Sequence, residues 1–180
     1  KNILSGAGFT EVFRYVFTGE QELKAFGLDT RSLIEVANPI APEHRFLASI
    51  ALPSYIRAAK ENESHEDSIR IFGLTKGFAK GKGVWLNEVS EKKRLVIIWS
   101  EKSGTKNELF FGLKGVVDEL FEALGLAEYW YDDEIEARTR SRELPFFHPY
   151  RTAEIRVDNQ KVGVIGELHP GCCGVEHLRL

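Results

Sequence analysis

The residues best able to do chemistry lie near the end of the sequence. His148, Glu167, His169, Cys172 and Cys173 offer imidazole, carboxylate and thiolate groups, which are suitable zinc ligands. A metal-dependent hydrolase built on His148, Glu167 and His169 is therefore one hypothesis. The pattern does not favour it, because there is no His-Glu-x-x-His or paired Cys-x-x-Cys motif and both histidines precede a proline. A histidine before proline more often braces a turn, so we assign no catalytic and no metal-binding residue.

The two cysteines, Cys172 and Cys173, are adjacent and flanked by glycine. A nucleophilic role would require an oriented base, and closeness in sequence to His169 and His177 does not supply one. Neighbouring cysteines seldom meet disulfide geometry, and the chain has no third cysteine. We therefore expect a reducing, cytoplasmic setting.

Two glycine-containing segments superficially suggest nucleotide binding. Residues 77–82 lack the spacing of a phosphate loop, and no Ser or Thr follows Lys82. Gly6-Ala7-Gly8 precedes a predicted strand rather than a helix, so it does not fit a dinucleotide-binding turn. The sequence thus predicts no cofactor-binding residue.

The charge pattern is uneven. The net charge of −3 does not indicate a nucleic-acid-binding domain as a whole. Arg138, Arg140 and Arg142 are spaced by two, so they would share one face of an extended segment. They would form either a ridge that contacts phosphate or a charged edge that discourages aggregation. Two further basic clusters are Lys76, Lys80 and Lys82, and Lys92, Lys93 and Arg94.

The element that must position the two histidines is a β-hairpin. Residues 152–157 alternate, with Ala153, Ile155 and Val157 on one face and polar side chains on the other, which predicts a half-buried strand. Residues 158–161 have turn composition, and residues 162–168 return as a second strand.

The rest of the chain alternates irregularly between predicted helices and strands. Helices are predicted at 1–8, 21–26, 54–63 and 109–124, and strands at 11–18, 32–37, 68–74, 95–99, 129–131, 152–157 and 162–168. We expect 77–83 to be a loop, and 95–99 to be a central strand covered on both faces. This order predicts an α+β fold, a largely antiparallel β-sheet flanked by helices, in a single domain over 1–180. No window approaches the roughly 18 apolar residues of a membrane span.

A series of short segments, in order over nearly the whole chain, resembles one family. The segments are Gly8-Phe9-Thr10-Glu11-Val12, Asn38-Pro39-Ile40-Ala41-Pro42-Glu43, Leu52-Pro53 with Asn62, Lys114-Gly115, His148-Pro149 and Gly166-Glu167-Leu168-His169-Pro170. The series resembles the catalytic-like domain of the bacterial phenylalanyl-tRNA synthetase beta subunit.

The chain also departs from that family. The family usually has Arg-Thr-Ser-Leu before Leu52-Pro53, whereas this chain has Ala48-Ser49-Ile50-Ala51. Phe72-Gly73-Leu74-Thr75 stands where the family has Phe-Glu-x-Gly. After Pro170, Gly171-Cys172-Cys173-Gly174 interrupts an expected helix. An arginine near Ala48 and a glutamate near Gly73 are thus missing, and an arginine fork is the group that would grip a phosphate.

The resemblance implies a class II aminoacyl-tRNA synthetase-like core without catalytic residues. It implies a fragment of a larger beta subunit whose alpha-subunit partner makes the aminoacyl-adenylate with ATP, Mg²⁺ and phenylalanine. The assembly would contain two alpha and two beta chains, in the cytoplasm, with tRNA at most peripheral to this domain and no membrane contact.

Three functional hypotheses follow. The first is a non-catalytic structural domain that binds its partner subunit through apolar surface, with Phe110, Phe111, Trp130, Phe146 and Phe147 as candidates. The second is the metal-dependent hydrolase described above. The third is a tRNA-binding module that uses the Arg138/Arg140/Arg142 ridge.

Overall fold

The computed structural model describes residues 1–81, 89–103, 106–133 and 145–169. Within these residues the order of elements is α1 (Asn2–Gly6), β1 (Thr10–Glu11), β2 (Phe17–Thr18), α2 (Glu20–Ala25), β3 (Ile34–Glu35), a 3-10 turn η1 (Pro42–His44), β4 (Phe46–Leu47), α3 (Leu52–Asn62), β5 (Ser68–Lys80), β6 (Val89–Glu101), α4 (Lys106–Ala123), β7 (Tyr129–Asp132), β8 (Phe147–Val157) and β9 (Gln160–Leu168). All four predicted helices are present.

Three of the four helices in the described residues are followed by a glycine. Gly8, Gly27 and Gly125 follow α1, α2 and α4 and have φ of 84°, 64° and 73°, a left-handed conformation that glycine adopts without strain. Helix α3 begins with Pro53 in its first turn, where a missing N–H costs no hydrogen bond. These local signals explain why the helices were predictable.

The long hairpin β5–β6 forms the spine of the molecule. Its two strands pair antiparallel from Ser68↔Glu101 to Lys80↔Val89, and β1 pairs parallel with β5. The prediction of a loop at 77–83 is therefore wrong for residues 77–80. Phe78 N donates to Ala48 O at 3.0 Å, and Gly77 packs tightly against the Ser49 carbonyl, so this tertiary pairing holds the segment extended.

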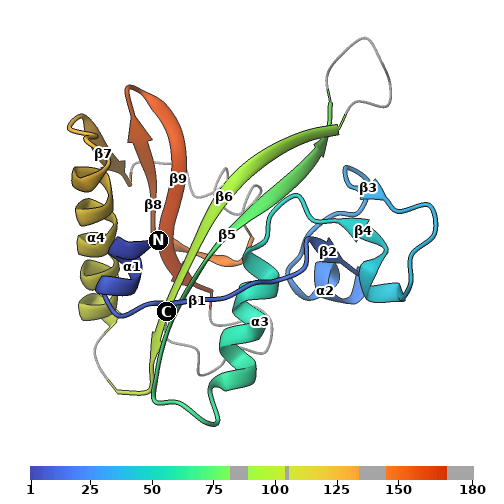
Figure 1. The fold of residues 1–180 in the computed structure, drawn as a ribbon, viewed down its shortest axis with the longest axis horizontal. Coiled ribbons are helices and arrows are strands. Elements are labelled where there is room, and N and C mark those ends of the chain that lie inside the picture. Colours follow the sequence, from blue (N-terminus) through green and yellow to red (C-terminus); the bar gives the residue numbers. More distant parts are fainter. Residues whose placement is uncertain (82–88, 104–105, 134–144, 170–180) are drawn as a thin grey trace.

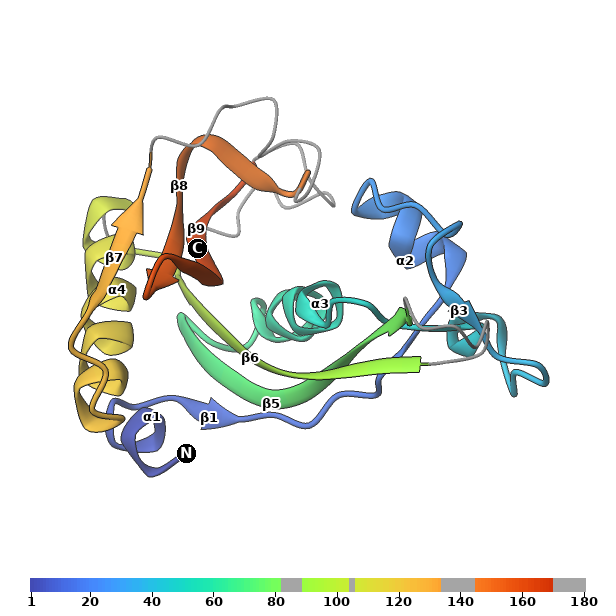
Figure 2. The same ribbon diagram turned by 90° about the horizontal axis from the view of Figure 1, so that it is seen from above.

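Residues 96–99 of β6 are covered on both faces, as predicted, whereas Leu95 is 39% exposed. Val96 and Ile98 lie on the α3 side, while Ile97 and Trp99 pack against the cluster of α1 and α4. The strand is not central in the pairing order, however, because that order is β1-β5-β6 within the described residues. Figure 2 shows α3 on the concave side of the curved β5–β6 ribbon, with α1 and β1 along the other side.

Two smaller sheets complete the fold. Strands β2, β4 and β3 form one antiparallel sheet, and β7, β8 and β9 form another beside α4 (Figure 1). The structure is thus mixed α+β with mostly antiparallel pairing, as predicted, but its strands are divided among three sheets. The predicted strands at 11–18 and 32–37 are reduced to short pairs, because only β1, β2 and β3 find partners there.

The hairpin β8–β9 is present where the alternation predicted it. Asp158 and Asn159 have φ of 48° and 64°, which suits the two-residue turn that joins Val157 to Gln160. The prediction that the strand at 152–157 is half-buried is wrong, because Thr152 and Glu154 on its polar face are buried as well. None of the helices in the described parts of the chain has the length and apolar character needed to span a membrane.

Candidate functional site

The concave face of β5–β6 is filled by α3. Tyr55 is 1% exposed, and its ring and hydroxyl lie against Gly73, so that any Cβ at this position would collide with them. Tyr55 Oη donates to Val12 O at 3.0 Å. Burial raises the pKa of Tyr55, so the phenol stays neutral. The sheet face therefore carries packed apolar side chains at this point rather than an open cleft.

Ala48 lies at a backbone junction beside this face. Its N–H donates to Val16 O at 2.8 Å, and its carbonyl accepts from Phe78 N at 3.0 Å. The residue is buried. The position where the family resemblance places an arginine thus holds a methyl group enclosed between two extended segments, and it presents no cation to a phosphate.

The three residues of the hydrolase hypothesis do not form a metal site. The rings of His148 and His169 stack with centroids 6.2 Å apart. Glu167 is buried, and its Oε2 lies 2.6 Å from Arg151 Nε. Over the described ranges, no three His, Cys, Asp or Glu side chains converge as a metal site would require. The hydrolase hypothesis gains no support, and Cys172 and Cys173 lie outside the described residues.

The two histidines instead brace the ends of the hairpin. His148 Nδ1 accepts a hydrogen bond from Tyr150 N at 3.2 Å, two residues further along the chain. The backbone N–H of His169 donates to Phe146 O at 2.8 Å. The contact of the His148 ring agrees with the bracing role predicted for a histidine before proline. The bond of His169 is made by its backbone, so it does not test that role for the His169 side chain.

A buried ion network joins β7, β8 and β9. Glu154 accepts from Lys161 at 2.7 Å and from Arg156 at 2.8 Å, and Arg156 Nε lies 3.1 Å from Asp132 Oδ2. Desolvation is the largest influence on the pKa of Glu154 and raises it, but the hydrogen bonds and charges of Lys161 and Arg156 outweigh it and hold that pKa below its usual value. The network neutralises its own charges, so it is a structural clamp rather than a reactive centre.

The predicted aromatic interface is only partly exposed. Phe146 is wrong as an interface residue, because it is fully buried and its ring packs edge-on against Phe26. Phe147 and Phe110 are partly buried against the apolar clusters. Phe111 and Trp130 are exposed. Arg138, Arg140 and Arg142 lie outside the described residues.

A second exposed apolar surface was missed in the sequence. We call it the N-terminal aromatic strip, and it consists of Phe13, Tyr15, Phe17 and His44. Phe13 and Tyr15 are 79% and 77% exposed, and the His44 ring lies 5.8 Å from that of Tyr15 and 5.6 Å from that of Phe17. The sequence signal for this surface is the recurrence of aromatic residues at positions 13, 15 and 17, which lie within the predicted strand 11–18.

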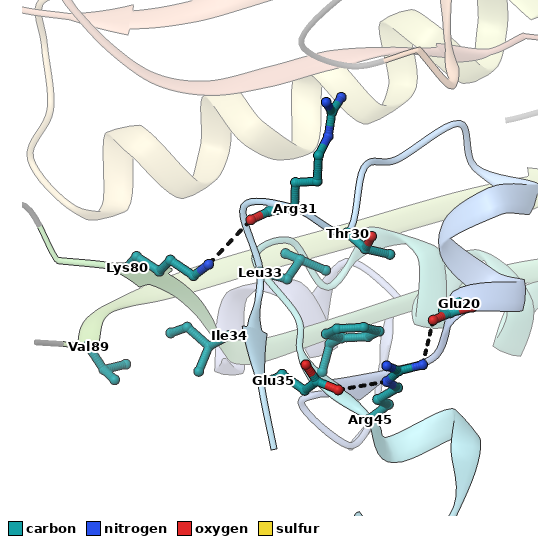
Figure 3. Close-up of a pocket in the computed structure, with 10 residues that line it drawn as sticks. Glu20, Thr30, Arg31, Leu33, Ile34, Glu35, Arg45, Lys80 and Val89 are labelled. Atoms are coloured by element: carbon teal, nitrogen blue, oxygen red, sulfur yellow. Dashed lines mark hydrogen bonds and ion pairs between the residues drawn. The ribbon is translucent and has the colours of Figure 1, made fainter. Parts of the chain in front are cut away.

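A hollow of about 520 Å³ lies between the small β2-β4-β3 sheet and the far end of β5–β6 (Figure 3). Arg45 donates to Glu35 at 2.9 Å and to Glu20 at 2.6 Å, so its charge is balanced within the hollow. Lys80 Nζ donates to Arg31 O at 3.3 Å. The lining residues are Glu20, Thr30, Arg31, Leu33, Ile34, Glu35, Arg45, Phe46, Lys80 and Val89. The lining thus carries three cations, Arg31, Arg45 and Lys80, against the carboxylates of Glu20 and Glu35. Arg31 also pairs with Asp29 at 2.6 Å.

The similarity of the chain to solved structures concerns its fold. It superposes with a TM-score of 0.63 on a pyrrolysyl tRNA synthetase, PylSc of Desulfitobacterium hafniense, over 89% of this chain and 52% of that one. The sequences are 16% identical. This likeness shows that the arrangement of strands and helices is one that a tRNA synthetase uses.

Sequence relatives identify the family. The chain is 32% identical over 178 residues to the phenylalanine–tRNA ligase beta subunit of Staphylococcus aureus (strain USA300), and 34% identical over 170 residues to that of Solibacter usitatus. Each match covers 94% of this chain but only 21% and 20% of the relatives, so the chain spans about a fifth of their length. The model of the phenylalanyl tRNA synthetase beta chain CLM domain matches residues 1–179. The chain therefore belongs to the phenylalanyl tRNA synthetase beta chain CLM domain family.

Proposed function

We propose that this chain is the non-catalytic, subunit-binding domain of a two-subunit phenylalanine–tRNA ligase, built on a class II synthetase-like core. Its partner is the alpha subunit, which holds ATP, Mg²⁺ and phenylalanine and makes the aminoacyl-adenylate. The domain supports a cytoplasmic assembly of two alpha and two beta chains. Both sequence relatives are named as beta subunits of this ligase, which supports the partner.

One observation carries the non-catalytic part of the proposal. The concave face of β5–β6 is occupied by Tyr55 against Gly73, and Ala48 is enclosed by backbone pairing on both sides. A triphosphate needs cationic donors aimed at its oxygens, and the arginine fork is the group best shaped for that task. The packed apolar face supports a role in which the domain binds its partner subunit and carries out no reaction itself.

Calorimetry tests this part. The beta subunit, purified without its alpha partner, is titrated with ATP in the presence of Mg²⁺. We expect no saturable heat from this domain. Tight, magnesium-dependent uptake of ATP that is lost when residues of the β5–β6 face are replaced would contradict the proposal.

The surface best suited to the partner is the N-terminal aromatic strip. Exposed aromatic side chains are enriched at the centres of protein interfaces, where their burial supplies most of the affinity. Phe13 and Tyr15 are almost fully exposed, and within the described residues no apolar side chain covers them. In the proposal, both side chains are buried against apolar groups of the alpha subunit.

The interface is tested by assembly. The double variant Phe13→Ser/Tyr15→Ser in the full beta subunit should weaken its binding to the alpha subunit at least about tenfold, measured by co-purification and by analytical ultracentrifugation. Tyr150→Ser is the matched control, because Tyr150 is equally exposed but lies on β8. Equal assembly of the double variant and the control would show that the strip is not the contact.

A further inference from the structure

The far half of β5–β6 is strongly basic. We call residues 75–80 of β5 and 89–94 of β6 the basic arm. It carries five cationic side chains against a single carboxylate, Glu91, in a chain whose net charge is −3. All five cations are exposed, namely Lys76, Lys80, Lys92, Lys93 and Arg94. Figure 1 shows this end of the ribbon extending away from α1 and α4.

The strand register concentrates this charge. Lys76 lies directly opposite Lys93, while Lys92 and Arg94 face Gly77 and Thr75. Like charges placed directly opposite one another destabilise an antiparallel pair. Glu91 forms an ion pair with Lys76 at 2.7 Å, and over the described parts of the chain no carboxylate pairs with Lys92, Lys93 or Arg94. The fold therefore tolerates an unbalanced cluster that its own stability does not require.

Protection of a free strand edge explains only part of the cluster. Cations on an edge strand deter pairing with other chains, and β6 ends the order β1-β5-β6. Lys76 and Lys80 lie on the part of β5 beyond its pairing with β1 at Ile71 and Phe72, where Phe78 N bonds to Ala48 O. Edge protection does not explain why Lys76 is placed directly opposite Lys93. Successive residues of β6 also point to opposite faces, so Lys92, Lys93 and Arg94 place charge on both sides of the ribbon.

We propose that the basic arm binds the phosphate backbone of RNA. Lysine acts as a flexible point charge towards phosphate, and contacts of this kind position a nucleic acid without reading its sequence. Lys92 and Arg94 share one face about 7 Å apart, so they reach two points along a backbone. The RNA class follows from family membership, because the relatives are tRNA ligases. The proposal does not depend on which surface meets the alpha subunit.

The test measures the binding of fluorescently labelled tRNA to the assembled ligase at several salt concentrations. Lys92→Gln/Lys93→Gln/Arg94→Gln removes three unpaired exposed cations and should lower affinity at least about tenfold. The slope of log affinity against log salt should also decrease by roughly two to three, since each phosphate contact contributes about one. The charge-matched control is Lys24→Gln/Lys60→Gln/Lys102→Gln, which removes three exposed cations from other elements and should change little.

Each outcome decides the proposal. Equal affinity and equal salt slope for the two triple variants would overturn it. The proposal would also be overturned if tRNA binding were lost only in samples that have lost the alpha subunit, which ultracentrifugation of the same samples detects. If polyglutamate competes for the arm while tRNA does not, the arm binds an acidic protein surface and the RNA proposal fails. The single variant Lys93→Gln, which also relieves repulsion with Lys76, should retain its melting temperature and still weaken tRNA binding.

Discussion

At the scale of single residues, Tyr55 and Gly73 form a pair that explains a departure from the family. The family resemblance places a glutamate at position 73, whereas this chain has glycine there. The Tyr55 hydroxyl occupies the adjoining space and donates to Val12 O. A side chain at 73 and the tyrosine at 55 therefore exclude each other in this structure.

The pair gives a direct prediction. Gly73→Ala should destabilise the chain by about 1–3 kcal/mol, because the added methyl group overpacks against a ring that cannot move out of the core. In a Tyr55→Ala background the same substitution should cost much less, since the obstructing ring is gone. Urea unfolding of the two single variants and the double variant measures this coupling. Equal costs of Gly73→Ala in both backgrounds would show that the contact does not exist.

The histidines illustrate what residue types alone can and cannot predict. His148 and His169 were brought together, as the hairpin predicted, and their ring centroids lie 6.2 Å apart. Glu167 does not join them in a three-ligand group, because Arg151 on the neighbouring strand holds its carboxylate. The sequence contains both the carboxylate and the cation, but it does not reveal which partner lies closer until the cross-strand register is known.

At the scale of elements, the predictable parts are those with local signals. Helices α1, α2 and α4 end at glycines with positive φ, and the hairpin turn at Asp158 and Asn159 has the residue composition typical of a turn. Residues 77–80 of β5 were predicted to be loop, because glycine and lysine dominate the segment 77–83. The extended form of residues 77–80 comes from pairing with β6 and with Ala48, which are contacts distant in sequence.

Burial across the hairpin β8–β9 was also beyond the sequence. The alternation correctly placed Ala153 and Ile155 on a face packed against α4. It placed Glu154 on the opposite face, where a carboxylate was expected to meet solvent. Lys161 and Arg156 pair with Glu154 there and allow it to be buried. A charged residue in a strand indicates a solvent-exposed position only if no oppositely charged side chain lies beside it. The periodicity of the sequence does not show which side chains lie beside it.

At the scale of the whole molecule, the surface divides into an apolar strip at the N-terminal end and a basic arm along β5–β6. The two proposals assign them to different partners, a protein subunit and an RNA. Apolar burial depends weakly on salt, whereas phosphate contacts depend on it steeply. Raising the ionic strength should therefore release tRNA while the assembly with the alpha subunit persists, which separates the two surfaces in one sample.

The carboxylates of the molecule set its response to acid. Ion pairs and hydrogen bonds lower the pKa values of Asp67, Glu101, Asp118 and Glu154; at Asp118 and Glu154 these partners overcome an opposing effect of burial. A group whose pKa is lower in the folded state stabilises the fold above its unfolded pKa, which is about 4 for these side chains. That contribution disappears as pH falls through the lower, folded pKa.

We therefore expect the melting temperature to hold near neutral pH and to fall as pH drops from about 5 towards 2. Protonation breaks the ion pairs of Glu154 with Arg156 and Lys161 and that of Asp118 with Lys114. Glu154→Gln should lower the melting temperature at pH 7 and flatten its decline in acid, since the variant has one fewer carboxylate to protonate. The control, Glu119→Gln, alters an exposed glutamate of α4 and should leave the profile unchanged. A profile for Glu154→Gln that runs parallel to that of the unaltered chain would show that the ion network of the hairpin does not stabilise the fold.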